Sequence, residues 1–309
     1  MNLFAYGLDW KAGEEVILGT QERFSEHEAY QALERRYGIR IVWVDIPAPP
    51  DSVAQLVSLY ARAITPRTKV LVVSEVTYTS GLRAPPNDLT DLAHNRNVLI
   101  SVDGAQSFGV VPLDVKAIGV DHYAAPGQKW LLAGTGTGFS YLRKDLHEKV
   151  WPLCGYVDDN GEGGHGSPPG NRYERGGQVN IPASLGVAAA VDFQNAIGKD
   201  NIQARAGQLT NQLRSGLKQI AGVNQLTSSD SRLSAAITVF TVRNAATAQA
   251  LKYLREQEHL QVRAVKVGDV DAIRASTHFY NTPREIDRLL SGVSYLAQNV
   301  AESAGPAAL

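Results

Sequence analysis

The sequence predicts an α/β protein: a mainly parallel β-sheet with helices on both faces, followed by a smaller C-terminal α+β unit. Short apolar runs alternate with amphipathic stretches through the first half of the chain. Several of these runs are near-continuous in Val, Ile and Leu, which is typical of parallel strands buried on both faces. From about residue 229 the order becomes strand, helix, strand, strand, helix. Two domains are therefore expected, residues 1–200 and residues 201–309.

The individual elements follow from the spacing of apolar residues. In the larger unit, strands are expected at 15–19, 40–46, 69–76 and 98–102, and helices at 27–37, 52–64 and 89–95. Long helices at 183–197 and 201–220 follow, and a glycine-rich stretch predicts a flexible loop at 158–171. The smaller unit should contain strands at 235–242, 261–267 and 272–279, a helix at 246–258 and a closing helix from 283. The first eight residues, MNLFAYGL, indicate a helix already under way, because no capping residue precedes it.

Composition restricts the class of protein. The 309 residues include 30 basic and 31 acidic side chains, a formal charge of −1 that does not indicate a nucleic-acid or anionic-lipid partner. A single cysteine, Cys154, excludes an intramolecular disulfide, and the histidines show no metal-ligand spacing. No apolar run reaches the roughly 18 residues of a membrane span, and the N-terminus does not resemble a signal peptide. We expect a cytoplasmic protein with a small-molecule substrate and no metal, membrane or nucleic-acid partner.

The glycines at Gly134–Gly138, GTGTG, could suggest a dinucleotide loop. They lack the G-x-G-x-x-G spacing, and the residues that follow, FSYLR, predict a strand rather than a helix. A helix N-terminus for a pyrophosphate is therefore missing. The glycines predict a turn that lets the backbone pass close to other groups.

Two residues of the sequence are candidates for a chemical role. Asp103 follows an apolar strand, at the edge where ligands of parallel sheets bind, although an aspartate there often only hydrogen-bonds its own turn. Lys129 lies between apolar residues and the bulky Trp130, a poor setting for a freely solvated charge. A desolvated lysine has a lowered pKa and becomes a nucleophilic amine. A carboxylate for a pyridinium nitrogen and an amine for an imine are what a pyridoxal phosphate enzyme needs from its protein.

The segment SVDGAQSFGVVPLDVKAIGVDHYAAPGQKWLLAGTGTGFSYLRKDL closely resembles the class V aminotransferase family, which includes cysteine desulfurases and isopenicillin N epimerase-like proteins. Weaker similarity extends to the C-terminus through YERGGQVNIPASLGVAAAVDF and IRASTHFYNTPREIDRLL. The resemblance implies an aspartate aminotransferase-like fold, the cofactor pyridoxal 5′-phosphate and a homodimer with shared active sites.

The resemblance also implies a role for individual residues. Lys129 would form the internal aldimine with the cofactor and move the proton. Asp103 would pair with the pyridine nitrogen, and Gln106 would hydrogen-bond the phenolic oxygen. Arg274 would hold the substrate carboxylate, a task that suits its planar guanidinium.

Four further positions match cofactor-binding positions of the family. Thr77, in VTYTSG, matches a residue that faces the ring substituents, and Gln128 precedes the lysine as in the epimerase-like branch. Phe24 lies near the ring-stacking position, with Arg23 as the alternative register. Gly177 stands where the family has a threonine that reaches the phosphate in the neighbouring subunit.

Some features depart from the family pattern. The family has a glycine-threonine phosphate loop before the helix with which this sequence begins, and that loop is absent from this sequence. Pro126 and Gly177 replace residues that contact the cofactor phosphate in the family. A truncated or degenerate homologue with weakened cofactor binding and a non-catalytic role is therefore the rival interpretation. No cysteine lies between Val262 and Arg274, where a persulfide-forming desulfurase needs one. The expected activity is amino-acid chemistry, with C–S lysis, epimerisation and transamination all left open.

Overall fold

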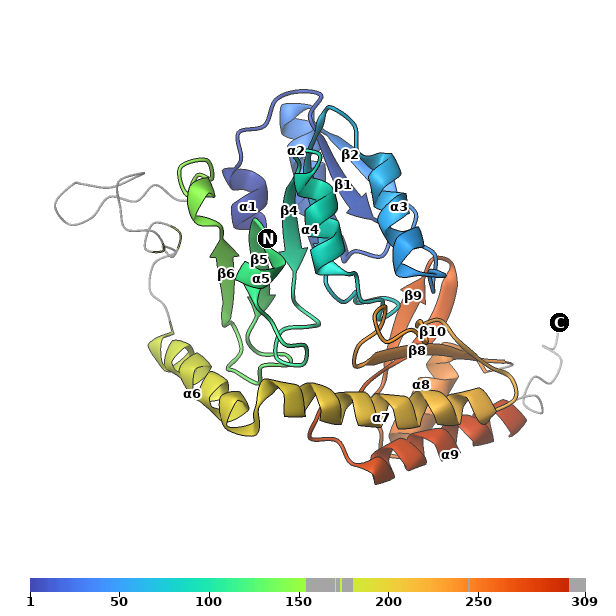
Figure 1. Cartoon of the computed structure of the whole chain (residues 1–309). Helices are drawn as coiled ribbons and strands as arrows, with labels where there is room; N and C mark the ends of the chain where they lie inside the picture. Colours follow the sequence, from blue (N-terminus) through green and yellow to red (C-terminus); the bar gives the residue numbers. More distant parts are fainter. Residues whose placement is uncertain (154–169, 171–172, 174–179, 244, 300–309) are drawn as a thin grey trace.

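The computed structural model describes residues 1–153, 170, 173, 180–243 and 245–299. Its larger sheet has six strands in the order β2-β1-β3-β4-β5-β6 (Figure 1). Strands β1 to β5 pair in parallel, and β6 runs antiparallel to β5. The bounds are β1 Glu15–Gly19, β2 Arg40–Val44, β3 Thr68–Ser74, β4 Leu99–Asp103, β5 His122–Pro126 and β6 Gly138–Leu142. The predicted mainly parallel sheet is confirmed.

Helices cover both faces of this sheet, as predicted. Because side chains alternate along a strand, Val16 and Val70 pack with helices α1 and α2, whereas Ile17 and Leu71 pack with α3 and α4. The hydroxyl of Ser52 caps α3 by accepting a hydrogen bond from the Gln55 amide at 3.1 Å. The bounds are α1 Asn2–Gly7, α2 Phe24–Tyr37, α3 Val53–Ala63, α4 Pro86–His94, α5 Val115–Ile118 and the 3₁₀ turn η1 Lys144–Leu146.

The C-terminal part is built on a second, antiparallel sheet of order β7-β8-β10-β9. Long helices α6 and α7 precede it, and α7 runs below both sheets in Figure 1. The bounds are α6 Ile181–Ile197, α7 Lys199–Gln219, β7 Val223–Gln225, β8 Ile237–Val242, α8 Thr247–Glu256, β9 Arg263–Val267, β10 Val270–Ser276 and α9 Pro283–Asn299. The predicted α+β unit is confirmed, and the domain division at residue 200 stays a prediction.

The two faces of the small sheet have different partners. Phe240 and Ile273 pack with helices α7, α8 and α9. Val239 and Ala272 instead belong to an apolar cluster with Val76 and Trp130, which follow β3 and β5 of the large sheet. The small sheet therefore covers the carboxyl edge of the large one, where ligands bind in open α/β sheets.

Gly134–Gly138 ends the connection from β5 to β6 and leads into a strand, as predicted, with Gly136 at φ 83° in the left-handed region. The predicted loop 158–171 lies outside the described residues, apart from Gly170. None of the helices that the structure describes is long and apolar enough to cross a membrane.

Candidate active site

A cavity of about 410 Å³ lies where the small sheet meets the connections beyond the large sheet. Four residues predicted for the site line it together: Gln106, Gln128, Lys129 and Arg274. The remaining lining residues are Arg23, Tyr78, Trp130, Arg263, Ser276, His278 and Tyr280. The tertiary structure thus brings together side chains from the connections after four strands of the large sheet and from β9 and β10.

Trp130 fixes the backbone next to the half-buried Lys129. Its indole Nε1 donates a hydrogen bond to Oε1 of Gln106 at 3.1 Å, and its ring stacks on His278 with centroids 5.1 Å apart. Its carbonyl accepts a hydrogen bond from Nε2 of Gln194 at 2.7 Å and lies 3.1 Å from Nε2 of His278. Because both the side chain and the carbonyl are held, the lysine projects from a rigid base.

Asp103 ends β4 and is 8 % exposed. It lines a second cavity, of about 600 Å³, together with Met1, Ala124 and Pro126. Its Oδ1 accepts a hydrogen bond from the Ala105 amide at 2.8 Å. The local turn bond expected of such an aspartate therefore exists, but within the described part of the chain it uses only one carboxylate oxygen. The second oxygen is available to a ligand.

A second buried carboxyl lies close to Asp103. Glu22 follows β1, is 5 % exposed and accepts hydrogen bonds from the Ser74 hydroxyl and, at 2.8 Å, from the Ser74 amide. Burial raises the pKa of Glu22 to about 7; the Ser74 hydrogen bonds oppose this rise, and the charge of Asp103 adds to it. Ser74 and Asp103 are paired across β3 and β4. Glu22 thus titrates near neutral pH beside the predicted cofactor-binding carboxylate.

Arg274 enters the cavity from β10. One guanidinium nitrogen, Nη1, donates a hydrogen bond to the carbonyl of Tyr78 at 3.0 Å, and Nη2 lies 3.4 Å from the Ser276 hydroxyl. Its Nε is buried without a partner among the residues described. Burial lowers the pKa of Arg274, the Tyr78 hydroxyl raises it, and the nearby Arg263 lowers it further. This guanidinium can still accept an anionic ligand.

Besides Asp103, the predicted residues Thr77 and Phe24 do not line this cavity. Thr77 is buried, and its hydroxyl accepts a hydrogen bond from the Leu82 amide at 3.1 Å. Phe24 begins α2 with its side chain 63 % exposed, whereas Arg23 lines the cavity, so the geometry favours the alternative register. Gly177 lies outside the described residues.

Sequence reasoning missed Tyr78, Arg263 and Gln194 as parts of the site. A signal existed for Arg263, because the strands predicted around it and around Arg274 form a hairpin in which these two residues are paired. For Gln194 there was none, because it contacts Trp130 across 64 residues of sequence.

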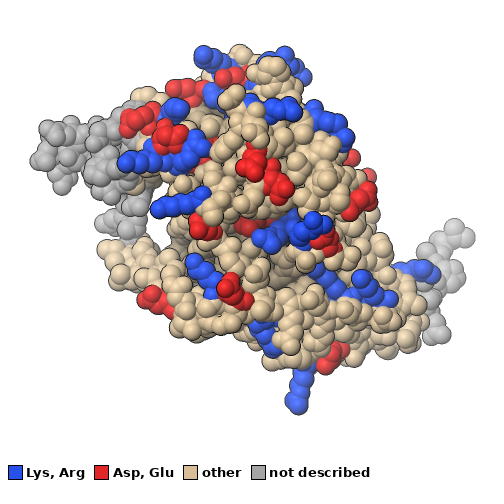
Figure 2. Space-filling model, in the orientation of Figure 1, with Lys and Arg blue, Asp and Glu red and all other residues tan. Residues whose placement is uncertain are grey.

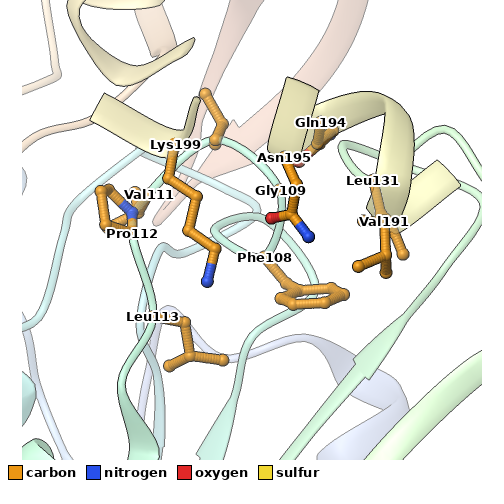
Figure 3. Close-up of a pocket in the computed structure, with 11 residues that line it drawn as sticks. Phe108, Gly109, Val111, Pro112, Leu113, Leu131, Val191, Gln194, Asn195 and Lys199 are labelled. Carbon is orange, nitrogen blue, oxygen red and sulfur yellow. The ribbon is translucent and has the colours of Figure 1, made fainter. Parts of the chain in front are cut away.

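A third pocket, of about 160 Å³, lies between residues 108–113 and helix α6 (Figure 3). Phe108, Leu113, Leu131 and Val191 line it, and Lys199 is the one titratable group among its described lining residues. The amides of Gln194 and Asn195 also line it, but none of its described lining residues is an Asp, Glu or His that could act as a general acid or base beside the amine. The cavity of Lys129 is therefore the candidate active site.

The sheet topology, with Lys129 and Arg274 in one cavity beyond the carboxyl edge, defines an α/β protein of the aspartate aminotransferase-like type. Residues 1–289 match the family Aminotransferase class-V, and the chain belongs to this family of enzymes. It is 31 % identical over 301 residues to isopenicillin N epimerase of Amycolatopsis lactamdurans, covering 93 % of this chain and 75 % of that protein. A probable cysteine desulfurase of Methanothermobacter thermautotrophicus is 28 % identical, over 94 % of this chain and 74 % of the relative. The resemblance stated from the sequence is confirmed.

Solved structures of related enzymes have the same fold as this chain. A cystine C–S lyase in complex with its product cysteine persulfide superposes with a TM-score of 0.86 at 26 % identity, covering 96 % of this chain and 78 % of that one. A mutant of that lyase carries glycine covalently linked to its pyridoxal phosphate cofactor. The apo cysteine desulfurase of Thermococcus onnurineus NA1 has a TM-score of 0.85 at 24 % identity, covering 96 % and 76 % of the two chains. This last likeness supports the fold.

Proposed function

We propose that this protein removes the proton from Cα of an α-amino acid, with pyridoxal 5′-phosphate as the cofactor that its class V membership indicates. The observation that carries the proposal is that Lys129 and Arg274 line one cavity. The first is an amine that can bond to the cofactor, and the second is a guanidinium that can hold the substrate carboxylate. Removal of this proton is common to C–S lysis, epimerisation and transamination.

Asp103 and Gln106 support this choice of cofactor, although Asp103 lines a different cavity from Lys129. Asp103 offers one carboxylate oxygen beyond its turn bond, in a buried position suited to a protonated ring nitrogen. Gln106 holds Trp130 through its carbonyl oxygen, so its amide nitrogen can donate to the cofactor. Bound pyridoxal phosphate supplies an electron sink for negative charge at Cα.

Side chains of this protein orient the substrate and move the proton. Arg274 orients the substrate through its carboxylate, and the Nζ of Lys129 accepts and returns the Cα proton. Trp130, held on both its ring and its carbonyl, keeps that amine in place. The stacked rings of Trp130 and His278 add an apolar wall, and burial lowers the pKa of His278.

The hairpin before Arg274 supports a reaction without a protein persulfide. Val267 of β9 pairs with Val270 of β10, so only Gly268 and Asp269 connect the two strands. This tight connection carries no cysteine, and the single cysteine of the chain, Cys154, lies outside the described residues.

A homodimer is part of the proposal. Helix α6 presents Ile181, Leu185 and Phe193 with 62 %, 67 % and 53 % of their side chains exposed. Residues four and eight apart lie on one helix face, so these side chains form a single apolar stripe. A stripe of this kind suits contact with a second copy of the chain.

An absorbance scan with added pyridoxal phosphate, combined with deuterium exchange at Cα of added amino acids, tests the proposal. The protein should gain a band near the visible edge and catalyse exchange. Lys129→Ala should lose both, whereas Lys199→Ala, which alters the separate apolar pocket, should keep both. If the unaltered protein shows neither band nor exchange, the proposal is overturned in favour of a non-catalytic homologue.

A further inference from the structure

One tyrosine ring in the active-site cavity is surrounded by three arginines. The guanidinium carbons of Arg274, Arg263 and Arg23 lie 4.6, 5.6 and 5.8 Å from the ring centroid of Tyr78. Each distance is within the range of a cation–π contact. A ring has only two negative faces and a positive edge, so it cannot offer three cations equally good positions.

Two of these arginines repel one another directly. Arg263 and Arg274 are paired residues of β9 and β10, and like charges opposite each other on neighbouring strands are destabilising. The lowering of the pKa of Arg274 by Arg263 reflects the same repulsion.

Among the described residues, no carboxylate balances this charge at either paired arginine. The described residues that line the cavity include Arg23, Arg263, Arg274 and Lys129 but no Asp or Glu. Within the described ranges, neither Arg263 nor Arg274 makes an ion pair, and the Nε of Arg274 is buried without a partner. A cavity lined by one sign of charge attracts anions.

In another cavity lined by arginines, the protein itself supplies partners for the guanidinium groups. Arg214 donates hydrogen bonds to the carbonyls of Ala235 and Ile237, and Arg83 lies 3.9 Å from the carboxylate of Glu75. On the face drawn in Figure 2, basic and acidic side chains are likewise interspersed. The paired cations Arg263 and Arg274, without an ion pair among the described residues, therefore distinguish the active-site cavity from the cavity of Arg214.

The proposed function uses only one of the three guanidinium groups, because Arg274 suffices for the α-carboxylate. Arg23 and Arg263 are exposed to the solvent of the cavity, where a group on the substrate side chain can reach them. We infer that the substrate is an amino acid whose side chain ends in a second carboxylate, bound by Arg263 with Arg23 beside it. This inference rests on the proposed function.

The inference is tested with acids and their uncharged amides: L-glutamate against L-glutamine, and L-aspartate against L-asparagine. Each pair is nearly isosteric, so differences report on charge. The holoenzyme should exchange the Cα proton of at least one acid with a kcat/KM about 10- to 100-fold higher than that of its amide, as one charge-assisted contact supplies. Arg263→Met should bring the ratio close to one, because the acid loses the contact that the amide never makes. Arg255→Met, an exposed arginine at the end of α8, should leave the ratio as it is.

Two further measurements separate the alternatives. Calorimetric binding of glutarate to the holoprotein requires no turnover: binding that Arg263→Met abolishes supports the inference even if exchange, and with it the proposed function, fails. The affinity for pyridoxal phosphate should not change in Arg263→Met. A weakened cofactor affinity with an unchanged acid-to-amide ratio would assign the arginines to the cofactor phosphate and overturn the inference. Equal kcat/KM values of the unaltered enzyme for acids and amides would also overturn the inference, as would failure of glutarate to bind.

Discussion

The indole Nε1 of Trp130 donates a hydrogen bond of 3.1 Å to the amide oxygen of Gln106. Both residues are buried, and they come from the connections after two neighbouring strands, β5 and β4. This bond joins the backbone beside Lys129 to the turn that follows Asp103. The predicted imine-forming and ring-binding residues are therefore held in one rigid unit.

Trp130→Phe should remove this bond while keeping an aromatic ring. The buried oxygen of Gln106 would lose its partner, at a cost of about 1 to 3 kcal/mol in the free energy of unfolding. Urea denaturation of the apoprotein measures this change. Trp43→Phe, at an exposed site on the edge strand β2, should stay within about 0.5 kcal/mol of the unaltered protein. Equal losses for the two variants would contradict the assigned role of the bond.

The stability of the protein should fall with rising pH through Glu22. Burial raises its folded-state pKa from 4.5 to about 7, so the folded form holds a proton that the unfolded form releases. This stabilisation is complete below about pH 4.5 and is lost as the pH rises through 7. Between pH 5 and pH 8 the loss in the free energy of unfolding amounts to about 2 to 3 kcal/mol.

Glu22→Gln removes this titration. The difference between the unfolding free energies of the unaltered protein and Glu22→Gln should change by that amount between pH 5 and pH 8, in favour of the variant at the higher pH. The control is Glu28→Gln, which replaces an exposed glutamate on α2. A pH-independent difference for Glu22→Gln would show that the carboxyl does not titrate in this range.

Arg214 of α7 should be a main support of the small sheet. Its guanidinium donates to the carbonyls of Ala235 and Ile237 at 2.9 and 2.8 Å and to the hydroxyls of Ser234 and Thr238 at 2.7 and 3.1 Å. Burial lowers its pKa to about 10, so it stays charged at neutral pH.

Arg214→Met should leave these acceptors unpaired and lower the free energy of unfolding by about 3 kcal/mol or more. Lys218→Met, one turn further along α7 and exposed, is the matched control and should have little effect. Thermal and urea unfolding both measure the difference, and comparable stability of the two variants would argue against this role for Arg214.

The apolar stripe on α6 should control self-association. Leu185→Glu places a charge among Ile181 and Phe193 and should shift the protein from dimer to monomer in light scattering after gel filtration. Tyr37→Glu, at an exposed aromatic residue of α2, should leave the dimer intact. A dimer that persists in Leu185→Glu would exclude the stripe from the interface.

The sequence determined the elements and their order, because apolar spacing is a local property of the chain. The strand at residues 15–19 was predicted at its observed bounds, and the helix predicted at 52–64 begins directly after its cap, Ser52. Strands β5 and β7 were missed, since one carries a histidine and a proline and the other has only three residues. The lysine site was recognisable because Asp103, Gln106 and Lys129 lie within one continuous motif.

Only the tertiary structure decided which distant residues share the cavity. Arg274 contacts the carbonyl of Tyr78 across 196 residues, and Arg263 reaches the same ring from the neighbouring strand. The choice between Arg23 and Phe24 also depended on the direction in which the chain enters α2. Such contacts arise from the packing of the small sheet over the carboxyl edge of the large one, and no local pattern encodes them.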